Sequence, residues 1–200
     1  MTRCREILVC VALLASVTAC GGAVVQGESS ITTGEPTTTR PSRALPPRPR
    51  DIPLAGVDAC QVLTDDQLRQ LGYSLKRSPV ANNRTGESQC DVANQFGSAP
   101  NYGTLITVST SEDASVWLSP ERQGDIASNL RTTIEDFPAL KLTGKTFKDN
   151  CQIIVDVADG QHLDILTNSA TGARSENPEP FCTQSQTIAE MAIRTLSARK

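Results

Sequence analysis

The sequence predicts an α+β fold: a single domain in which an antiparallel β-sheet carries flanking helices and two disulfides, preceded by a signal peptide and a disordered tether. Three observations predict the domain: a helix start signal at Thr64, alternating strand patterns on both sides of Asp159-Gly160, and an amphipathic stretch that ends near Ser197. Without its N-terminal low-complexity stretch, the chain keeps roughly 150 residues, a usual size for one domain.

The first twenty residues have the layout of a bacterial signal peptide that ends in a lipid-attachment cysteine. Arg3 and Arg5 precede an apolar run over residues 7–17, two small residues follow, and a cysteine stands at Cys20. The apolar run is too short to cross a bilayer, which takes about 20 residues. The pattern predicts a signal peptide over residues 1–19 and a lipid anchor on Cys20, which would hold the chain at the extracytoplasmic face of the cell membrane.

Residues 20–53 are predicted to form the lipid-anchored disordered tether, and residues 54–200 the globular domain. The tether is rich in Gly, Ser, Thr and Pro and has few large apolar residues, so it cannot bury enough surface to fold. From Asp51 onward the chain carries 13 Lys and Arg against 19 Asp and Glu, a net charge of −6. This acidic balance disfavours nucleic acid as a partner, because nucleic-acid affinity depends on Lys and Arg at phosphates.

Four of the seven cysteines remain in the predicted domain: Cys60, Cys90, Cys151 and Cys182. An even number in an exported chain predicts two disulfides, for which three pairings are possible. The division of the cysteines between the two halves of the domain favours Cys60 with Cys90 and Cys151 with Cys182. Zinc is disfavoured, since structural zinc usually uses cysteine pairs about two to four residues apart. No metal or other cofactor is expected.

The first predicted helix begins after Thr64 and ends at Gly72. Thr64 and Gln67 form a capping-box pattern, and Leu63 and Leu68 form a hydrophobic staple. A helix is therefore expected to open the domain.

Strand patterns follow over residues 89–93 and 104–110, separated by a loop rich in Gly, Pro and Asn. Ser111 or Ser119 is then predicted to begin a middle helix that runs toward Leu130.

Residues 151–157 and 161–167 are predicted to pair as a hairpin around Ala158, Asp159 and Gly160. A three-residue loop with a left-handed Gly160 places the apolar side chains of both strands on one face, whereas a two-residue loop would place polar side chains there. The expected partners are Val155 with Leu163 and Ile153 with Ile165.

A last helix is predicted over about residues 183–197, docked on the sheet near Cys182. Its apolar stripe contains Ile188, Met191, Ala192 and Leu196, and the residues away from the stripe are Ser185, Gln186, Glu190 and Arg194.

Several landmarks together resemble a known family. They are Asp58-Ala59-Cys60 before Leu63-Thr64 and Leu71-Gly72, then Cys90, Phe137-Pro138-Ala139, the Cys151 strand with its Asp159-Gly160 turn, and Cys182 opening a helix with Ala189-Glu190. In this order after a lipobox, they resemble the actinobacterial lipoproteins grouped as domain of unknown function 3558, over most of residues 58–196. The resemblance implies export, lipid anchoring and an α+β domain, without an assigned chemistry. Members often carry an aromatic residue where this chain has Val92, so packing around that disulfide is expected to differ.

His162 is the only histidine, so any Ser-His-Asp or Cys-His arrangement must use it. The hairpin register places it on the outer sheet face opposite Asp156 and near Asp164. The chain has no Gly-x-Ser-x-Gly elbow to supply a nucleophile. An exposed strand histidine is the favoured interpretation, so no enzyme activity is expected, and a hydrolase using His162 is the less favoured alternative.

Asp156, Asp159 and Asp164 cluster around the hairpin and raise the possibility of a calcium site, since calcium binds several oxygens at once. Their spacing fits no EF-hand loop, and turn chemistry already explains Asp159-Gly160. No metal site is therefore predicted.

Tyr102 and Trp117 are the candidate ligand-binding residues. A loop aromatic and a helix aromatic can lie on one rim while keeping a polar group in water, although core packing is the alternative. An anchor, a tether and a stapled domain without a catalytic set predict a binding or sensing protein of the cell envelope, with an envelope protein or a small ligand as partner. An envelope accessory or scaffold protein is the alternative.

Overall fold

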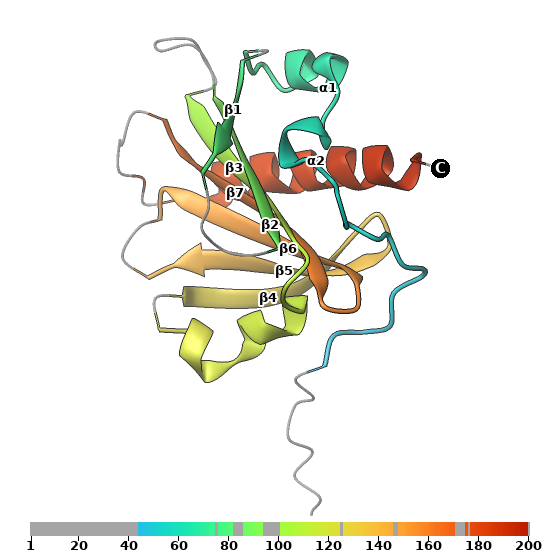
Figure 1. Cartoon of the computed structure of the whole chain (residues 1–200). Helices are drawn as coiled ribbons and strands as arrows, with labels where there is room; N and C mark the ends of the chain where they lie inside the picture. Colours follow the sequence, from blue (N-terminus) through green and yellow to red (C-terminus); the bar gives the residue numbers. More distant parts are fainter. Residues whose placement is uncertain are drawn as a thin grey trace, which may run out of the picture. The chain divides into compact units, whose positions relative to one another are not determined.

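The computed structural model describes residues 44–74, 76–81, 86–93, 101–124, 126–145, 148–170, 175 and 177–199. Its centre is a seven-stranded antiparallel sheet with the strand order β1-β2-β3-β7-β6-β5-β4 (Figure 1). The predicted fold class is confirmed, whereas the predicted signal peptide and Cys20 lie outside the described residues. The strands are β1 (Arg77–Val80), β2 (Glu87–Ala93), β3 (Tyr102–Ser109), β4 (Ile126–Ile134), β5 (Phe137–Gly144), β6 (Asn150–Ala158) and β7 (Gln161–Ser169), and the helices are η1 (Ala59–Gln61), α1 (Asp65–Gln70), η2 (Ala114–Leu118), η3 (Pro120–Arg122) and α2 (Glu179–Ser197).

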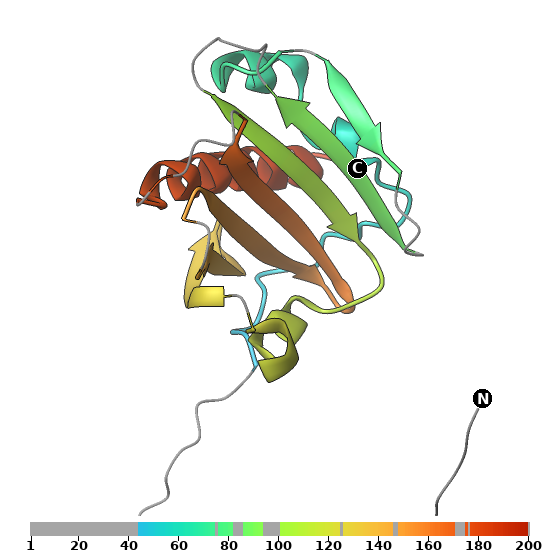
Figure 2. The same ribbon diagram turned by 90° about the vertical axis from the view of Figure 1, so that its left-hand side faces the viewer.

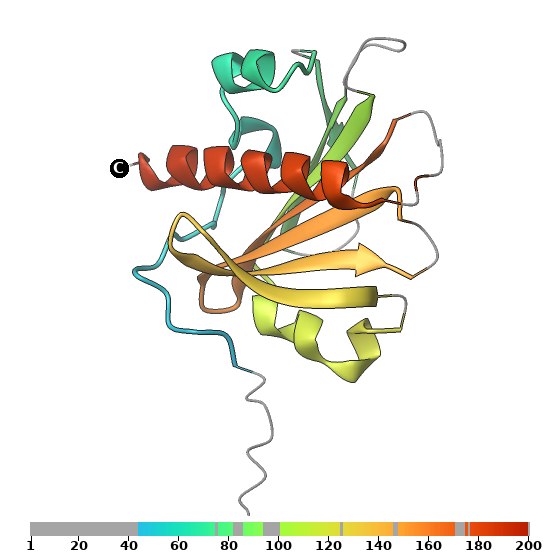
Figure 3. The same cartoon turned by 180° about the vertical axis from the view of Figure 1, so that it is seen from behind.

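Helix α2 lies across one face of the sheet and buries its apolar stripe there (Figure 3). It begins at Glu179, one turn before the predicted start, with a proline in its first turn. Ser185, predicted to lie away from the core, is fully buried because its hydroxyl donates a hydrogen bond to the carbonyl of Cys151 at 2.9 Å. The core between α2 and the sheet includes Ile106, Ile153, Val155, Leu163, Ile165, Ile188, Ala192 and Leu196.

The predicted cap of α1 is confirmed. The amide of Gln67 donates to the Thr64 hydroxyl, and the amide of Thr64 donates to the side-chain oxygen of Gln67. Gly72 then has a φ of 73°, the left-handed conformation expected at a helix end.

The predicted hairpin register is confirmed for β6 and β7: Val155 pairs with Leu163 and Ile153 with Ile165. The turn itself holds two residues instead of the predicted three, since Ala158 pairs with Gln161. A register shift between Asp156 and Ala158 absorbs the difference, and Gly160 adopts the expected left-handed conformation with a φ of 67°.

The predicted middle helix is wrong beyond residue 122. Two short 3₁₀ helices, η2 and η3, occupy its first part, and β4 at the edge of the sheet occupies the rest. The tight connection from β4 to β5 uses Glu135 and Asp136, both with positive φ (49° and 68°). A two-residue hairpin turn of this kind usually carries Asn or Gly, and Glu135-Asp136 lacks that turn signal.

Residues 44–53, predicted as the end of the disordered tether, lie against the domain; we call this segment the strap. Ile52 is 5% exposed and its amide donates to the carbonyl of Val157 at 2.7 Å. Leu45 packs on a second apolar cluster that includes Leu140, Ile154 and Trp117. The domain therefore begins before residue 54. Within the described ranges, no helix is long and apolar enough to cross a membrane.

Candidate functional site

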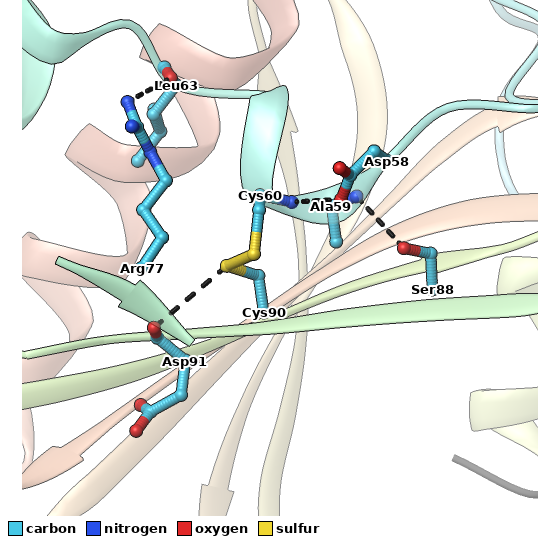
Figure 4. Close-up of a disulfide and its surroundings, with 8 residues drawn as sticks. All are labelled: Asp58, Ala59, Cys60, Leu63, Arg77, Ser88, Cys90 and Asp91. Carbon is cyan, nitrogen blue, oxygen red and sulfur yellow. Dashed lines mark hydrogen bonds between the residues drawn. A yellow bond between two sulfur atoms is a disulfide. The ribbon is translucent and has the colours of Figure 1, made fainter. Parts of the chain in front are cut away.

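The four domain cysteines form two disulfides, Cys60–Cys90 and Cys151–Cys182, in the favoured pairing. The first joins η1 to β2, where Asp58 accepts a hydrogen bond from the Cys60 amide (Figure 4). The second joins β6 to α2 and is buried at both ends. These bonds connect the helices to the sheet on the core side, so their role in the structure is mechanical support.

His162 is buried, with 2% exposure, whereas an exposed strand histidine was predicted. Its Nδ1 lies 2.9 Å from the carbonyl oxygen of Glu112 and donates to it, because a carbonyl can only accept. Burial lowers the pKa of His162, so the ring is held neutral. The prediction failed because the segment before η2 covers this part of the outer face.

The three hairpin aspartates do not share one site. The guanidinium of Arg48 in the strap donates to both oxygens of Asp156, at 2.8 and 3.0 Å, and is also hydrogen-bonded to Asp159. Arg48 further contacts Asp51 at 2.9 Å. Two of the three candidate calcium ligands are thus held by an arginine, and among the described residues no group of three His, Cys, Asp or Glu could hold a metal ion.

Tyr102 and Trp117, predicted to share a rim, lie in different clusters. Tyr102 begins β3 and meets the ring of Phe181 edge-on at 5.5 Å between centroids, beside the Cys151–Cys182 bond. Trp117 belongs to η2, beyond the other end of β3, where Arg122 lies 4.9 Å from its ring centroid. The structure does not bring the two aromatic residues together.

The outer side of the sheet is covered unequally. Over β5 and β6, the segment of η2 packs on Leu140, Leu142 and Ile154. Over β2, β3 and β7, no described helix stands in front of the strands in Figure 2, and α2 lies behind them. We call the uncovered patch the open face. Pairing of the strands gives it two adjacent rows, Asp91-Leu105-Leu166-Gln152 and Gln89-Thr107-Asp164.

Asp164 is the most perturbed group of the open face. One carboxylate oxygen, Oδ2, accepts a hydrogen bond from Nε2 of Gln152 at 2.8 Å. The other, Oδ1, is buried and has no hydrogen-bond partner, although the residue as a whole is partly exposed. Burial, reinforced by the acids Glu87 and Glu112, raises the pKa of Asp164 to about 7. A carboxylate perturbed in this way marks Asp164 as a candidate site residue.

The neighbours of Asp164 supply both polar and apolar contacts. Nε2 of Gln89 donates to the hydroxyl of Thr107 at 3.2 Å, and Thr107 is the cross-strand partner of Asp164. Leu105 and Leu166 oppose each other in the next row and are both partly exposed. The sequence placed Asp164 on the outer face, but there it was considered only as a calcium ligand and as a neighbour of His162.

Comparison with known proteins gives a family and no closer relative. No curated protein matches the chain, and no solved structure matches it. One family model matches residues 15–195, which is most of the chain and includes every strand and nearly all of α2. The chain therefore belongs to the family described as protein of unknown function (DUF3558).

Proposed function

We propose that this protein is a lipid-anchored binding module of the cell envelope, held outside the membrane by Cys20, which contacts a ligand through the open face and does not transform it. The open face is the observation that carries the proposal. A sheet of this kind covers one face with a helix, and its second face is either solvated or occupied by a partner. Here the second face contains a buried carboxylate oxygen without a donor, which a solvated surface has no reason to keep.

Two further features support the cellular setting. Disulfides persist in oxidising compartments outside the cytoplasm, and this domain contains two. The signal-peptide pattern before Cys20 supplies the route of export and the site for the lipid. A binding role is favoured over hydrolysis because the ring of the only histidine is buried, with Nδ1 engaged by a main-chain carbonyl.

The anchor is tested by metabolic labelling with an alkyne fatty acid in a bacterial host that processes lipoproteins. The wild-type chain should take up the label and partition into detergent, and Cys20→Ala should do neither. A wild-type chain that keeps residues 1–19 and carries no acyl mass would overturn the anchor.

Binding is tested by photo-crosslinking in living cells that express the full chain. A photoreactive residue at Gln89, on the open face, should give a reproducible adduct. The same residue at Thr187, a partly exposed position of α2, is the matched control and should give none. Equal adduct patterns at both positions, or none at either, would refute a binding role for the open face.

A further inference from the structure

A short segment between β3 and β4 covers part of the outer side of the sheet. It consists of residues 111–122, which contain η2 and η3, and we call it the flap. Its apolar side chains, including that of Trp117, pack in a cluster that is separate from the main core and contains Leu140, Leu142 and Ile154 of the sheet. Helix α2 and the main core lie on the other side of the strands. The flap can therefore leave the sheet without disturbing that core.

Two side chains of the sheet hold the flap by donating hydrogen bonds to its main chain. Nδ1 of His162 in β7 donates to the carbonyl of Glu112 at 2.9 Å. Nδ2 of Asn129 in β4 donates to the carbonyl of Trp117 at 3.0 Å. Of these two donors, His162 alone changes its charge near neutral pH, because the amide of Asn129 does not titrate.

The surroundings of His162 oppose a second proton on its ring. The charged groups that face it are Glu87 of β2, Glu112 and Arg122 of the flap, and Asp156 of β6 with its partner Arg48 of the strap. Arg122 already occupies both carboxylate oxygens of Glu112, at 3.0 and 2.8 Å, and Arg48 occupies those of Asp156. A proton on Nε2 would thus form a cation that is withdrawn from water and finds these two carboxylates engaged. Burial outweighs the nearby acids and lowers the pKa of His162.

This arrangement links the position of the flap to pH in one direction. A histidine whose pKa is lowered by burial stabilises the buried state fully above its ordinary pKa of about 6.5, and progressively less as the pH falls below that value. Moving the flap away returns the ring of His162 to water, where its pKa takes the ordinary value. Protons therefore favour the state in which the flap is detached.

We propose that the flap is released by acid: a proton from solvent binds Nε2 of His162, the flap leaves the sheet, and the apolar cluster beneath it becomes accessible while the rest of the domain stays folded. At neutral pH, burial of that cluster keeps the flap closed. Release extends the uncovered outer side of the sheet from β7 toward β5, beside the open face. The flap goes beyond the proposed function and does not depend on the binding role of the open face.

Trp117 reports the flap directly, because it lies in η2 and is the only tryptophan of the chain. The full chain, purified with its disulfides intact, is titrated from pH 7.5 to pH 5 while acrylamide quenching of tryptophan fluorescence is measured. Release should raise the quenching constant by at least about twofold at pH 5, since the ring becomes open to solvent. Far-ultraviolet circular dichroism, to which α2 contributes as the longest helix, should stay unchanged over the same range.

Three variants complete the test. His162→Gln keeps a donor but cannot take up a proton, so its quenching should not change with pH. Asn129→Ala weakens the other attachment without altering His162, and should move the midpoint of the transition to higher pH. Glu190→Gln, on α2 at the other side of the sheet, is the matched control and should keep the wild-type transition.

A wild-type chain whose quenching is the same at both pH values would overturn the proposal, as would an equal rise in His162→Gln. A loss of circular dichroism in step with the quenching would mean that the whole domain unfolds, which also overturns release of the flap alone. If His162→Gln does not fold, Asn129→Ala decides, because an unshifted midpoint would show that the flap is not the element that moves.

Discussion

Replacing Arg48 with methionine should destabilise the domain, because it leaves Asp156 without a partner. The side chain of Asp156 is 8% exposed and that of Arg48 16%, so both charges are largely withdrawn from water. Breaking a fully buried pair costs about 3 to 5 kcal/mol. The other two carboxylates around Arg48, Asp51 and Asp159, are 59% and 95% exposed and add little. Since Arg48 is itself partly exposed, we expect a loss of about 2 to 4 kcal/mol in the free energy of unfolding.

The loss should depend on pH in a defined direction. Burial keeps the pKa of Asp156 above its usual value even with Arg48 in place, and removing the arginine raises that pKa further. The folded variant then binds more protons than its unfolded state, so its stability increases as the pH falls through the pKa of Asp156. The difference between wild type and Arg48→Met should therefore be largest near pH 7.5 and smaller near pH 5.

Urea denaturation of both proteins at the two pH values measures this. Arg69→Met is the matched control, since Arg69 is paired with Asp66 in an exposed pair and its loss should cost less than about 0.5 kcal/mol. Adding Asp156→Asn to Arg48→Met should restore part of the lost stability, because the unpaired charge is removed. An Arg48→Met protein within about 1 kcal/mol of wild type, or one with the same loss at both pH values, would show that the strap is not held in this way.

Three other predictions concern stability. Removal of the Cys60–Cys90 disulfide by replacing both cysteines with serine should cost about 3 to 4 kcal/mol in urea denaturation, since the bond closes a separation of 30 residues, and a loss below about 1 kcal/mol would contradict the entropic argument. Asp164→Asn should remove a decline in wild-type stability between about pH 4 and 7, the range in which the carboxyl is ionised in the unfolded chain but still protonated in the folded one, where its pKa is raised to about 7; denaturation midpoints at pH 5 and 7.5 would contradict this if both proteins changed equally. Gly160→Ala should cost about 1 kcal/mol through its φ of 67°, since open space surrounds the added methyl group; an unchanged midpoint would mean that the turn relaxes.

The elements that sequence reasoning located correctly are those specified by short-range chemistry. The capping box of Thr64 and Gln67 fixes the start of α1 through two reciprocal hydrogen bonds between residues that are three positions apart. The register of β6 and β7 follows from the requirement that Val155 and Leu163 share the buried face, since a slip by one residue would expose every apolar side chain of the hairpin. Information of this kind lies entirely within the segment that folds.

The sequence of strand β4 contains no short-range signal of this kind. It lies at the edge of the sheet and alternates little, with Leu130 54% exposed and only Ile134 fully buried. The turn that follows adopts a left-handed conformation at Glu135 and Asp136 without a glycine or asparagine to announce it. The strand forms because β5 pairs with it along nearly its whole length, and that partner is not visible in the local pattern.

The predictions for the strap and for His162 were wrong for a related reason. Alternation predicts on which face of the sheet a residue lies, but not which segment covers that residue. Alternation placed Asp156, His162 and Asp164 correctly on the outer side of the hairpin. What covers each of them comes from distant segments. Asp156 is engaged by Arg48, 108 residues away, and His162 by the carbonyl of Glu112, 50 residues away.

Asp164 differs from its two neighbours because neither of these distant segments supplies it with a donor. It lies two residues along β7 from His162, on the same face, yet among the described residues the side-chain donor that reaches it is Gln152 of the adjacent strand. If polar residues on this face were simply solvated, Oδ1 would be open to water and the pKa of the carboxyl would remain near its usual value. In the structure Oδ1 is buried instead, and this burial raises the pKa of Asp164 to about 7. A carboxylate kept in this condition destabilises the free domain at neutral pH, and this cost is the observation that supports the proposed binding role of the open face.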